Sequence, residues 1–296
     1  MKKHILFIIN TFAGNKQFRN VENVINGVIN KTFFDHSIVY TQYKGNAFEL
    51  SKDAVKQNFD VVVAVGGDGT INEVASALVD TQTALAIVPS GSGNGLAYHL
   101  RIPINLKKSI NIINDLHYEK IDVCKLNEFF LFSVAGVGYD AKVAFDFNHG
   151  KGRGMDAYFK AILKNYFTFK SENYIVQYDG NEIEKNAFFI TFANSSQWGY
   201  NVKVAPHASI QDGLLDVCFC TKPETITLSP FVIKLLTDRI DESREMQYLQ
   251  CKNLSIKAKN NNPIYLHIDG DAVEPVSEIM IQIIPKALNV LTERLI

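Results

Sequence analysis

Five apolar residues in a row, Val61 to Val65, run directly into the glycine-rich turn Gly66-Gly67-Asp68-Gly69-Thr70. An apolar run without alternation predicts a strand that is buried on both faces, as in a parallel sheet. A second run, Ala84–Val88, leads in the same way into Pro89-Ser90-Gly91-Ser92-Gly93-Asn94-Gly95. Helical spacing from Asn72 to Leu78 separates the two junctions. We therefore expect a strand–helix–strand unit of the α/β class.

The remainder of the first half continues this alternation. Further strands are expected at 5–9 and 37–40, and further helices at 21–29 and 47–55. This order predicts a doubly wound α/β domain over residues 1–122.

After about residue 120 the pattern changes to short strands that are separated by turns. These strands are expected at 129–134, 174–178, 188–192, 214–219, 254–258 and 279–284. The pattern predicts a mainly antiparallel β-sandwich over residues 123–284, with residues 285–296 returning to the first domain. Two helices interrupt it, one at Met155–Phe169 and one after Ser229-Pro230, which form a good N-cap and N1 pair.

Composition limits the class of protein. Of 296 residues, 47% are hydrophobic and 21% charged, which is typical of a folded soluble chain. The net charge of -1 gives no whole-molecule argument for nucleic-acid binding. The four cysteines form no C-x-x-C pair, so we expect buried thiols in a reducing cytoplasm. The apolar run Ile5–Ile9 is too short for a signal peptide, and no stretch reaches the length of a membrane span.

The glycine-rich junctions indicate phosphate binding. Glycines let the backbone approach a ligand closely, and a helix N-terminus offers unpaired N–H groups. Asp68 adds a carboxylate that suits magnesium. The alternative is a tight turn that is capped by Thr70, which is spaced from Glu73 as in a capping box. Neither loop is a P-loop or a G-x-G-x-x-G motif, so P-loop enzymes and typical dehydrogenases are disfavoured.

Together these loops resemble the diacylglycerol kinase catalytic domain, which bacterial diacylglycerol kinases share with sphingosine and ceramide kinases. Gly66–Asn72 is similar to its G-G-D-G-T-x-N signature and Pro89–Asn94 to its P-x-G-[ST]-G-N loop. Asn10–Gly14 is similar to its N-P-x-x-G segment. The resemblance implies an ATP site made by Asn10, Thr11, Phe12, Ala13, Gly14, Thr41, Gly66, Gly67, Asp68, Gly69, Thr70, Ile71, Asn72 and Ser92.

The second half carries the resemblance further. Phe132–Ala141 looks like the family's glycine-rich segment, and Ala205–Asp216 resembles its A-P-x-A-x-x-x-D-G-x-L-D run. In bacterial members that run holds a structural magnesium, which here implies metal ligands Ser209, Asp212 and Leu214. Without the family, Asp212-Gly213 reads as a hairpin turn.

Ile268-Asp269-Gly270-Asp271 resembles the family's D-G-E motif, whose acid is taken as the general base. The resemblance implies catalytic roles for Asp271 and Asp68, although Asp-Gly-Asp alone reads as a turn. Three positions depart from the pattern. Thr11 replaces a proline, Gly95 replaces an aspartate common in diacylglycerol kinases, and Asp271 is one methylene shorter than glutamate.

The resemblance implies an ATP- and Mg²⁺-dependent lipid kinase that acts on diacylglycerol or a sphingoid-type lipid. It would be a cytoplasmic protein in transient, peripheral contact with the inner face of the membrane. The alternatives are an NAD kinase-like enzyme with a soluble substrate and a catalytically silent lipid-binding protein. Aromatic residues and lysines on Met155–Phe169 suit either a membrane surface or an ordinary core-facing helix. The sequence leaves open the lipid, the regulation and whether the chain forms a homodimer.

Overall fold

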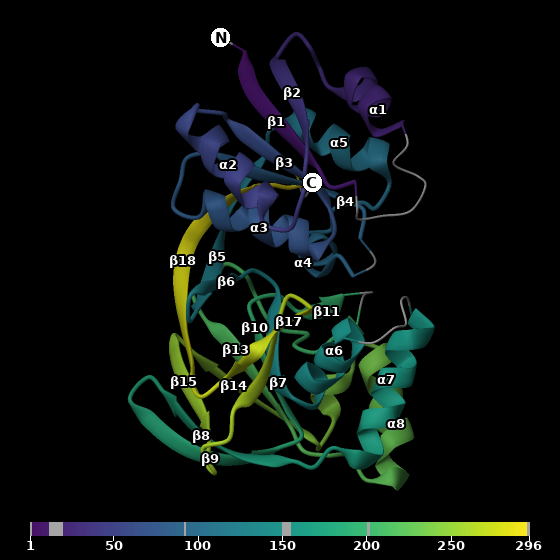
Figure 1. Ribbon diagram of the computed structural model, residues 1–296, viewed down its shortest axis with the longest axis vertical. Coiled ribbons are helices and arrows are strands. Elements are labelled where there is room, and N and C mark those ends of the chain that lie inside the picture. Colours follow the sequence, from purple (N-terminus) through teal and green to yellow (C-terminus); the bar gives the residue numbers. More distant parts are fainter. Residues whose placement is uncertain (1, 12–19, 92, 150–154, 200–201, 295–296) are drawn as a thin grey trace. The chain divides into compact units, whose positions relative to one another are not determined.

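The computed structural model describes residues 2–11, 20–91, 93–149, 155–199 and 202–294, without the side chains of 148, 149, 155–160 and 163 (Figure 1). The chain forms two compact units. The first contains residues up to Val123 together with Pro285 onwards, and the second contains Cys124–Ile284. Strands β5 (Tyr118–Leu126) and β18 (Ile279–Leu291) cross the two boundaries between the units.

The first unit is built on a parallel sheet with the order β2-β1-β3-β4, and the end of β18 pairs in parallel with β4. Its strands are β1 (Lys3–Ile9), β2 (Phe34–Tyr40), β3 (Val61–Gly66) and β4 (Ala84–Pro89). Its helices are α1 (Val21–Val28), α2 (Asn46–Lys56), α3 (Asp68–Leu78), α4 (Gly95–His99) and α5 (Leu106–Asp115).

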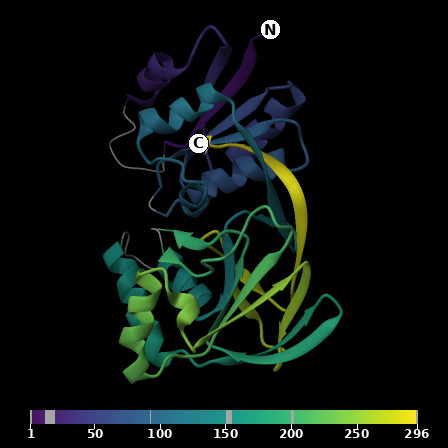
Figure 2. The ribbon, with the colours of Figure 1, turned by 180° about the vertical axis from the view of Figure 1, so that it is seen from behind.

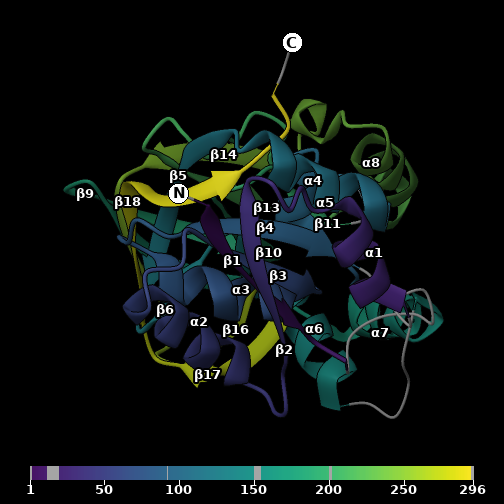
Figure 3. The same ribbon diagram turned by 90° about the horizontal axis from the view of Figure 1, so that it is seen from above.

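Helices cover both faces of this sheet. Helices α2 and α3 pack together on one face, while α1 and α5 pack together on the other (Figure 3). Every residue of β3 and β4 is buried. The core under α1 and α5 joins Phe7 and Val63 of the sheet to Ile25 and Ile110 of the helices. Double-sided burial explains why these strands are apolar without alternation.

The second unit is a sandwich of antiparallel strands. One sheet has the order β14-β13-β10-β7-β16-β17, and the other contains β18-β15-β8-β9 with β5 and β6. Its strands are β6 (Phe129–Leu131), β7 (Val134–Gly138), β8 (Glu172–Tyr178), β9 (Asn181–Ala187), β10 (Phe189–Ala193), β11 (Gln197–Gly199), β12 (Val202–Lys203), β13 (Leu215–Cys220), β14 (Met246–Cys251), β15 (Asn253–Ala258), β16 (Ile264–Ile268) and β17 (Asp271–Val276).

Two cores hold the second unit together. The larger lies between the sheets and contains Val137, Phe192, Ile256 and Ile281. The smaller lies beneath three helices, α6 (Tyr139–His149), α7 (Met155–Thr168) and α8 (Thr225–Leu236). These helices gather at one side of the sandwich (Figures 1 and 2).

The expected fold class is confirmed in both halves. All four cysteines are buried and free, and Cys218 and Cys220 lie in the same core, as expected. None of the helices in the described ranges is long and apolar enough to cross a membrane.

The predicted start of α8 is wrong. The helix begins at Thr225 with Glu224 as N-cap, so Pro230 lies inside it rather than at its first position. The reason is packing, because Leu228 contacts the smaller core and Phe231 is buried in it, which requires a helical turn before the proline.

Replacing Pro230 with alanine should stabilise the second unit by about 1–3 kcal/mol. Alanine supplies the N–H that an interior helical position donates to the fourth residue before it, here Ile226. The urea midpoint of unfolding measures the change. A lower midpoint would mean that the proline fits a local distortion that the helix requires.

Candidate functional site

The carboxyl ends of the parallel strands meet at one edge of the first unit. Strand β1 lies between β2 and β3, and β4 pairs with β3. In an open α/β sheet, ligands bind at this edge where the strand order reverses, which here is between β1 and β3. Asn10 follows β1 at that point, and the glycine-rich turn follows β3.

Hydrogen bonds tie the strand ends to one another. The Asn10 N–H donates to the Val65 carbonyl at 2.9 Å, and its Nδ2 donates to Thr70 Oγ1 at 2.8 Å. The Ser90 N–H donates to the Gly66 carbonyl at 2.8 Å. The three strand-to-loop junctions are therefore one connected structure.

The Asp68 carboxylate joins the two glycine-rich loops. Its Oδ2 accepts the N–H of Asn94 at 2.7 Å, and its Oδ1 accepts the N–H of Gly95 at 2.8 Å. Hydrogen bonds from two backbone amides to an ionised carboxylate are among the stronger ones in proteins. Asp68 therefore fixes the second loop against the first helical turn of α3.

Close packing explains the glycines in these loops. A Cβ at Gly91 would stand 2.5 Å from the Gly67 Cα, and one at Gly93 would stand 2.7 Å from Asp68 Oδ2. Asn94 closes the second loop from a left-handed conformation (φ 54°), accepting the Gly91 N–H and donating to the Gly91 carbonyl. The Gly67 backbone therefore leaves no room for a side chain at Gly91, and the Asp68 carboxylate leaves none at Gly93.

The structure brings most of the predicted nucleotide-binding residues to this edge. Gly66 ends β3, Gly67 is the N-cap of α3, and Asp68, Gly69, Thr70, Ile71 and Asn72 form the beginning of that helix. Ile71 is buried and its N–H donates to the Gly67 carbonyl, so it faces the core. Thr41 is buried beside β1, and its N–H donates to the Ile9 carbonyl. Thr11 is exposed. Phe12, Ala13, Gly14 and Ser92 lie outside the described residues.

The predicted capping box is wrong. Thr70 is the third residue of α3, and its hydroxyl accepts from Asn10 instead of capping the helix. The Glu73 carboxylate accepts the N–H groups of Gly45 at 2.8 Å and Ala47 at 3.1 Å, which start α2. Glu73 thus caps a neighbouring helix.

Asp271 stands beside a tight hairpin in the second unit. Strands β16 and β17 are joined by Asp269 and Gly270, which both have positive φ (50° and 88°). Two such residues define the turn that suits a two-residue hairpin. Asp271 pairs with Ile268 directly across it and is exposed.

The Asp269 carboxylate anchors that hairpin. Its Oδ1 accepts the N–H groups of Ser133 at 2.9 Å and Val134 at 3.1 Å, and its backbone N–H donates to the Val134 carbonyl. The loop before β7 therefore fixes the turn through both the side chain and the main chain of Asp269. Asp271 is held two residues away from this anchor.

Sequence reasoning missed a buried polar pair beside this hairpin. His267 Nε2 lies 3.3 Å from Asp140 Oδ2, and the Thr191 hydroxyl donates to the same oxygen at 3.5 Å. A Cβ at Gly136 would stand 2.2 Å from that oxygen, so the glycine makes room for the pair. The His267 Nδ1 is buried without a hydrogen-bond partner in the described structure. The only sequence signal was Asp140 at the end of the glycine-rich segment.

The predicted metal-binding residues lie in the loop before β13. The Asp212 Oδ1 accepts the Leu214 N–H at 3.0 Å, and the Gln211 N–H donates to the Ser209 hydroxyl. This is not the hairpin turn of paired strands, because β12 and β13 belong to different sheets.

Asp216, two residues after Leu214, is largely buried. Burial raises the pKa of its carboxyl to about 6, and its Oδ2 has no hydrogen-bond partner in the described structure. No group of three or more His, Cys, Asp or Glu side chains in the described ranges could hold a metal. A cation here would therefore need backbone carbonyls beside the Asp212 carboxylate, a donor set that Mg²⁺ and Ca²⁺ accept.

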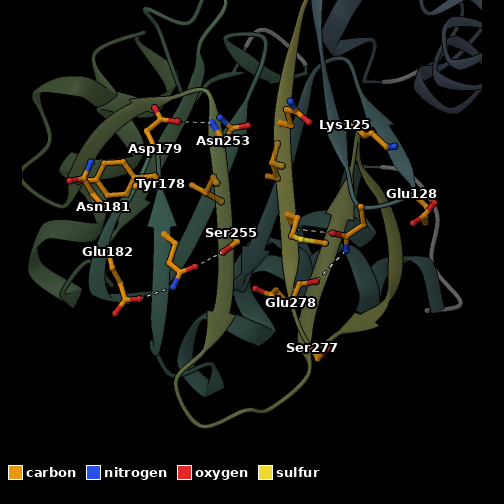
Figure 4. Close-up of a pocket in the computed structure, with 17 residues that line it drawn as sticks. Lys125, Glu128, Tyr178, Asp179, Asn181, Glu182, Asn253, Ser255, Ser277 and Glu278 are labelled. Atoms are coloured by element: carbon orange, nitrogen blue, oxygen red, sulfur yellow. Dashed lines mark hydrogen bonds between the residues drawn. The ribbon is translucent and has the colours of Figure 1, made fainter.

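An open hollow of about 1190 Å³ lies on the outer face of the second sheet of the sandwich (Figure 4). Side chains from β8, β15 and β18 line it, among them Tyr178, Ser255 and Met280. Its walls include none of the predicted site residues. Asp179 in this hollow accepts backbone N–H groups from Lys252 and Asn253, which gives it a structural role.

Comparison with known proteins assigns both units. The sequence model of the diacylglycerol kinase catalytic domain matches residues 4–126. The model of the YegS C-terminal NAD kinase beta sandwich-like domain matches residues 133–292. The chain therefore belongs to the diacylglycerol kinase family and is a kinase that phosphorylates an alcohol group.

Individual relatives agree over nearly the whole chain. A diacylglycerol kinase of Staphylococcus aureus (strain bovine RF122 / ET3-1) is 25% identical over 278 residues, covering 92% of this chain and 87% of the relative. One of Staphylococcus saprophyticus is 23% identical, covering 92% and 90%. A crystal structure of a diacylglycerol kinase from Bacillus anthracis has a TM-score of 0.77 at 20% identity, covers 99% of this chain and 97% of that one, and shares the fold.

Replacing Gly91 with alanine should destabilise the first unit by about 1–3 kcal/mol, because the new methyl group overlaps the Gly67 backbone. Gly27 inside α1 is a matched control, since a Cβ there meets no atom within 4 Å. Gly27→Ala should stabilise by about 0.5–1 kcal/mol. Thermal unfolding measures both changes, and equal effects would contradict close packing of the two loops.

Proposed function

We propose that the protein is an ATP-dependent lipid kinase that transfers the γ-phosphate of ATP to the hydroxyl group of a membrane lipid. The observation that carries the proposal is the bridge from Asp68 to the Asn94 and Gly95 amides. It joins two glycine-rich loops at the edge of the sheet where α/β ligands bind. Phosphoryl transfer depends mainly on positioning and charge neutralisation, and such loops supply both through backbone N–H groups.

In this proposal the loops that begin at Asn10, Gly66 and Pro89 bind the nucleotide. Thr41 and Ser92 belong to the same predicted site. Asp271 accepts the proton of the lipid hydroxyl as its oxygen attacks the γ-phosphate. Asp269 is a positioning residue, because its carboxylate fixes the turn that precedes Asp271. The reaction requires that Asp271 and the nucleotide loops act on the same bound substrates.

Magnesium would have two places in this proposal. Asp68 would hold the catalytic ion, which neutralises charge on the phosphates. Asp212, with the carbonyl groups of Ser209 and Leu214, would hold a structural ion. The oxygen-only donor set and the unpartnered Asp216 Oδ2 close to it support a hard cation at that loop.

Diacylglycerol and sphingoid-type lipids both offer the required hydroxyl, and Gly95 in place of the aspartate common in diacylglycerol kinases favours the second group. A cytoplasmic protein would reach either lipid by transient contact with the inner face of the membrane. The NAD kinase alternative rests on the Gly-Gly-Asp-Gly motif that both families contain. A lipid-binding protein without activity is disfavoured by the intact Asp68, Asn72 and Asp271.

The test is phosphate transfer from γ-labelled ATP with Mg²⁺ to diacylglycerol, sphingosine or ceramide in mixed micelles, with NAD as a soluble control. Label in the organic phase with one lipid is expected, and it would identify the substrate. Label on NAD would replace the proposal with the soluble-substrate alternative. A folded chain that binds ATP and transfers label to none of them would contradict it.

Replacing Asp271 with asparagine should lower kcat by about 10²–10⁴-fold, because the amide cannot accept the hydroxyl proton. The Kd for ATP, measured by calorimetry, should stay unchanged, since Asp271 lies outside the nucleotide loops. Glu274→Gln, on the same strand, serves as the control for a lost carboxylate. Unchanged turnover in Asp271→Asn would remove Asp271 from the reaction.

Replacing Asp212 with alanine should lower the melting temperature of the second unit and abolish its rise with added Mg²⁺. Binding to the folded state alone stabilises a protein in proportion to the logarithm of the ion concentration. Thermal unfolding at increasing Mg²⁺ measures this. If the variant has the same melting temperature and the same dependence on Mg²⁺ as the wild type, the structural ion is not bound by Asp212.

A further inference from the structure

Helix α8 exposes an unusual number of large apolar side chains. Ile226 is 82% exposed, Ile233 62% and Leu236 65%, and Val232 also faces solvent. The opposite side of the helix is already packed, since Phe231 is buried and Leu228 and Leu235 contact the smaller core. The exposed apolar residues are therefore not needed to hold the helix in place.

The outer side of α8 carries no charge. At 100° per residue, Ile226, Ser229, Pro230, Val232, Ile233 and Leu236 lie within one continuous arc, and Lys234 lies beyond its margin. A surface helix normally places charged or polar residues on its outer face. A contiguous apolar patch at the surface marks a binding surface for a protein or a membrane.

The patch continues onto the end of α7. Phe167 is 74% exposed, and Tyr166 is buried with its hydroxyl donating to the Pro223 carbonyl. A shallow hollow of about 380 Å³ between Phe167 and Thr225 connects the two helices. Tyr166 of α7 and Phe231 of α8 belong to the same smaller core. Of the aromatic residues on Met155–Phe169, Tyr166 is therefore a core residue and Phe167 is a surface residue.

The border of this patch is basic at the end of α7, where Lys164, Lys170 and Lys222 stand against one acid, Glu224. At the other end of α8, residues 237–242, which include the short helical turn packed against α8, carry Asp238, Asp241 and Glu242 beside Arg239. The Lys222 ammonium group donates to the Phe169 carbonyl and lies over the Tyr166 and Phe188 rings. The Lys234 ammonium group donates to the Glu242 carbonyl and also attracts the Glu242 carboxylate. Lys164 and Lys170 are exposed.

We infer that the outer face of α8, together with Phe167, is the surface by which the protein docks on an anionic lipid bilayer. The inference rests on the proposed function, which requires access to a membrane lipid. Aliphatic side chains beside lysines suit the boundary of headgroups and acyl chains. A second copy of the chain is the alternative occupant, and the oligomeric state in solution distinguishes it from a membrane.

The test is co-sedimentation with vesicles of phosphatidylglycerol and phosphatidylcholine. In the variant Ile233→Gln/Leu236→Gln, the partition coefficient should fall about tenfold or more, since two buried apolar side chains are lost. The variant Ile104→Gln/Met280→Gln removes two exposed apolar residues elsewhere and should bind like the wild type. Lys164→Gln/Lys170→Gln should weaken binding to phosphatidylglycerol vesicles and leave binding to pure phosphatidylcholine unchanged.

Vesicle binding needs neither ATP nor an acceptor, so it separates this inference from the kinase proposal. A chain that binds vesicles through α8 but transfers no phosphate would keep the docking surface and remove the proposed activity. Undiminished vesicle binding in Ile233→Gln/Leu236→Gln would overturn the docking surface. The docking surface would also be overturned if the wild type is a dimer in analytical ultracentrifugation and this variant is a monomer. In that case α8 would be a subunit interface.

Discussion

The structure of the edge where the two glycine-rich loops meet depends on one carboxylate. Asp68 begins α3 and accepts two consecutive amides, from Asn94 and Gly95, that begin the next helix along the chain. This contact lets the two loops approach until Gly67 and Gly91 touch, which only glycine permits. Because both loops follow strands that pair with each other, the sheet sets their spacing and Asp68 sets their contact.

The second unit uses the same device. The Asp269 carboxylate accepts consecutive amides of the loop before β7 and so holds the turn that presents Asp271. In both units a carboxylate bonded to main-chain amides positions the residues to which we assign binding or catalysis. Amide bonds of this kind hold the backbone in place, and a preorganised backbone is what phosphoryl transfer demands of an enzyme.

The sequence predicted those features that depend on neighbouring residues. Unbroken runs such as Val61–Val65 predicted buried parallel strands, and the glycines predicted the turns after them. The sequence could not show that Glu73 caps α2 or that Asp269 holds the loop at Ser133, because those partners are 26 and 136 residues away. The start of α8 was mistaken because the local Ser-Pro signal is weaker than the packing of Leu228 and Phe231. His267 gave no signal, since a single histidine on a strand reads as a core residue.

We propose that the two glycine-rich loops form a single nucleotide site. Hydrogen exchange of backbone amides with and without ATP and Mg²⁺ tests it most directly. Residues 66–72 and 90–95 should gain protection together and over the same range of ATP concentration. Protection of one loop alone, or of neither loop at ATP concentrations that saturate binding, would contradict it.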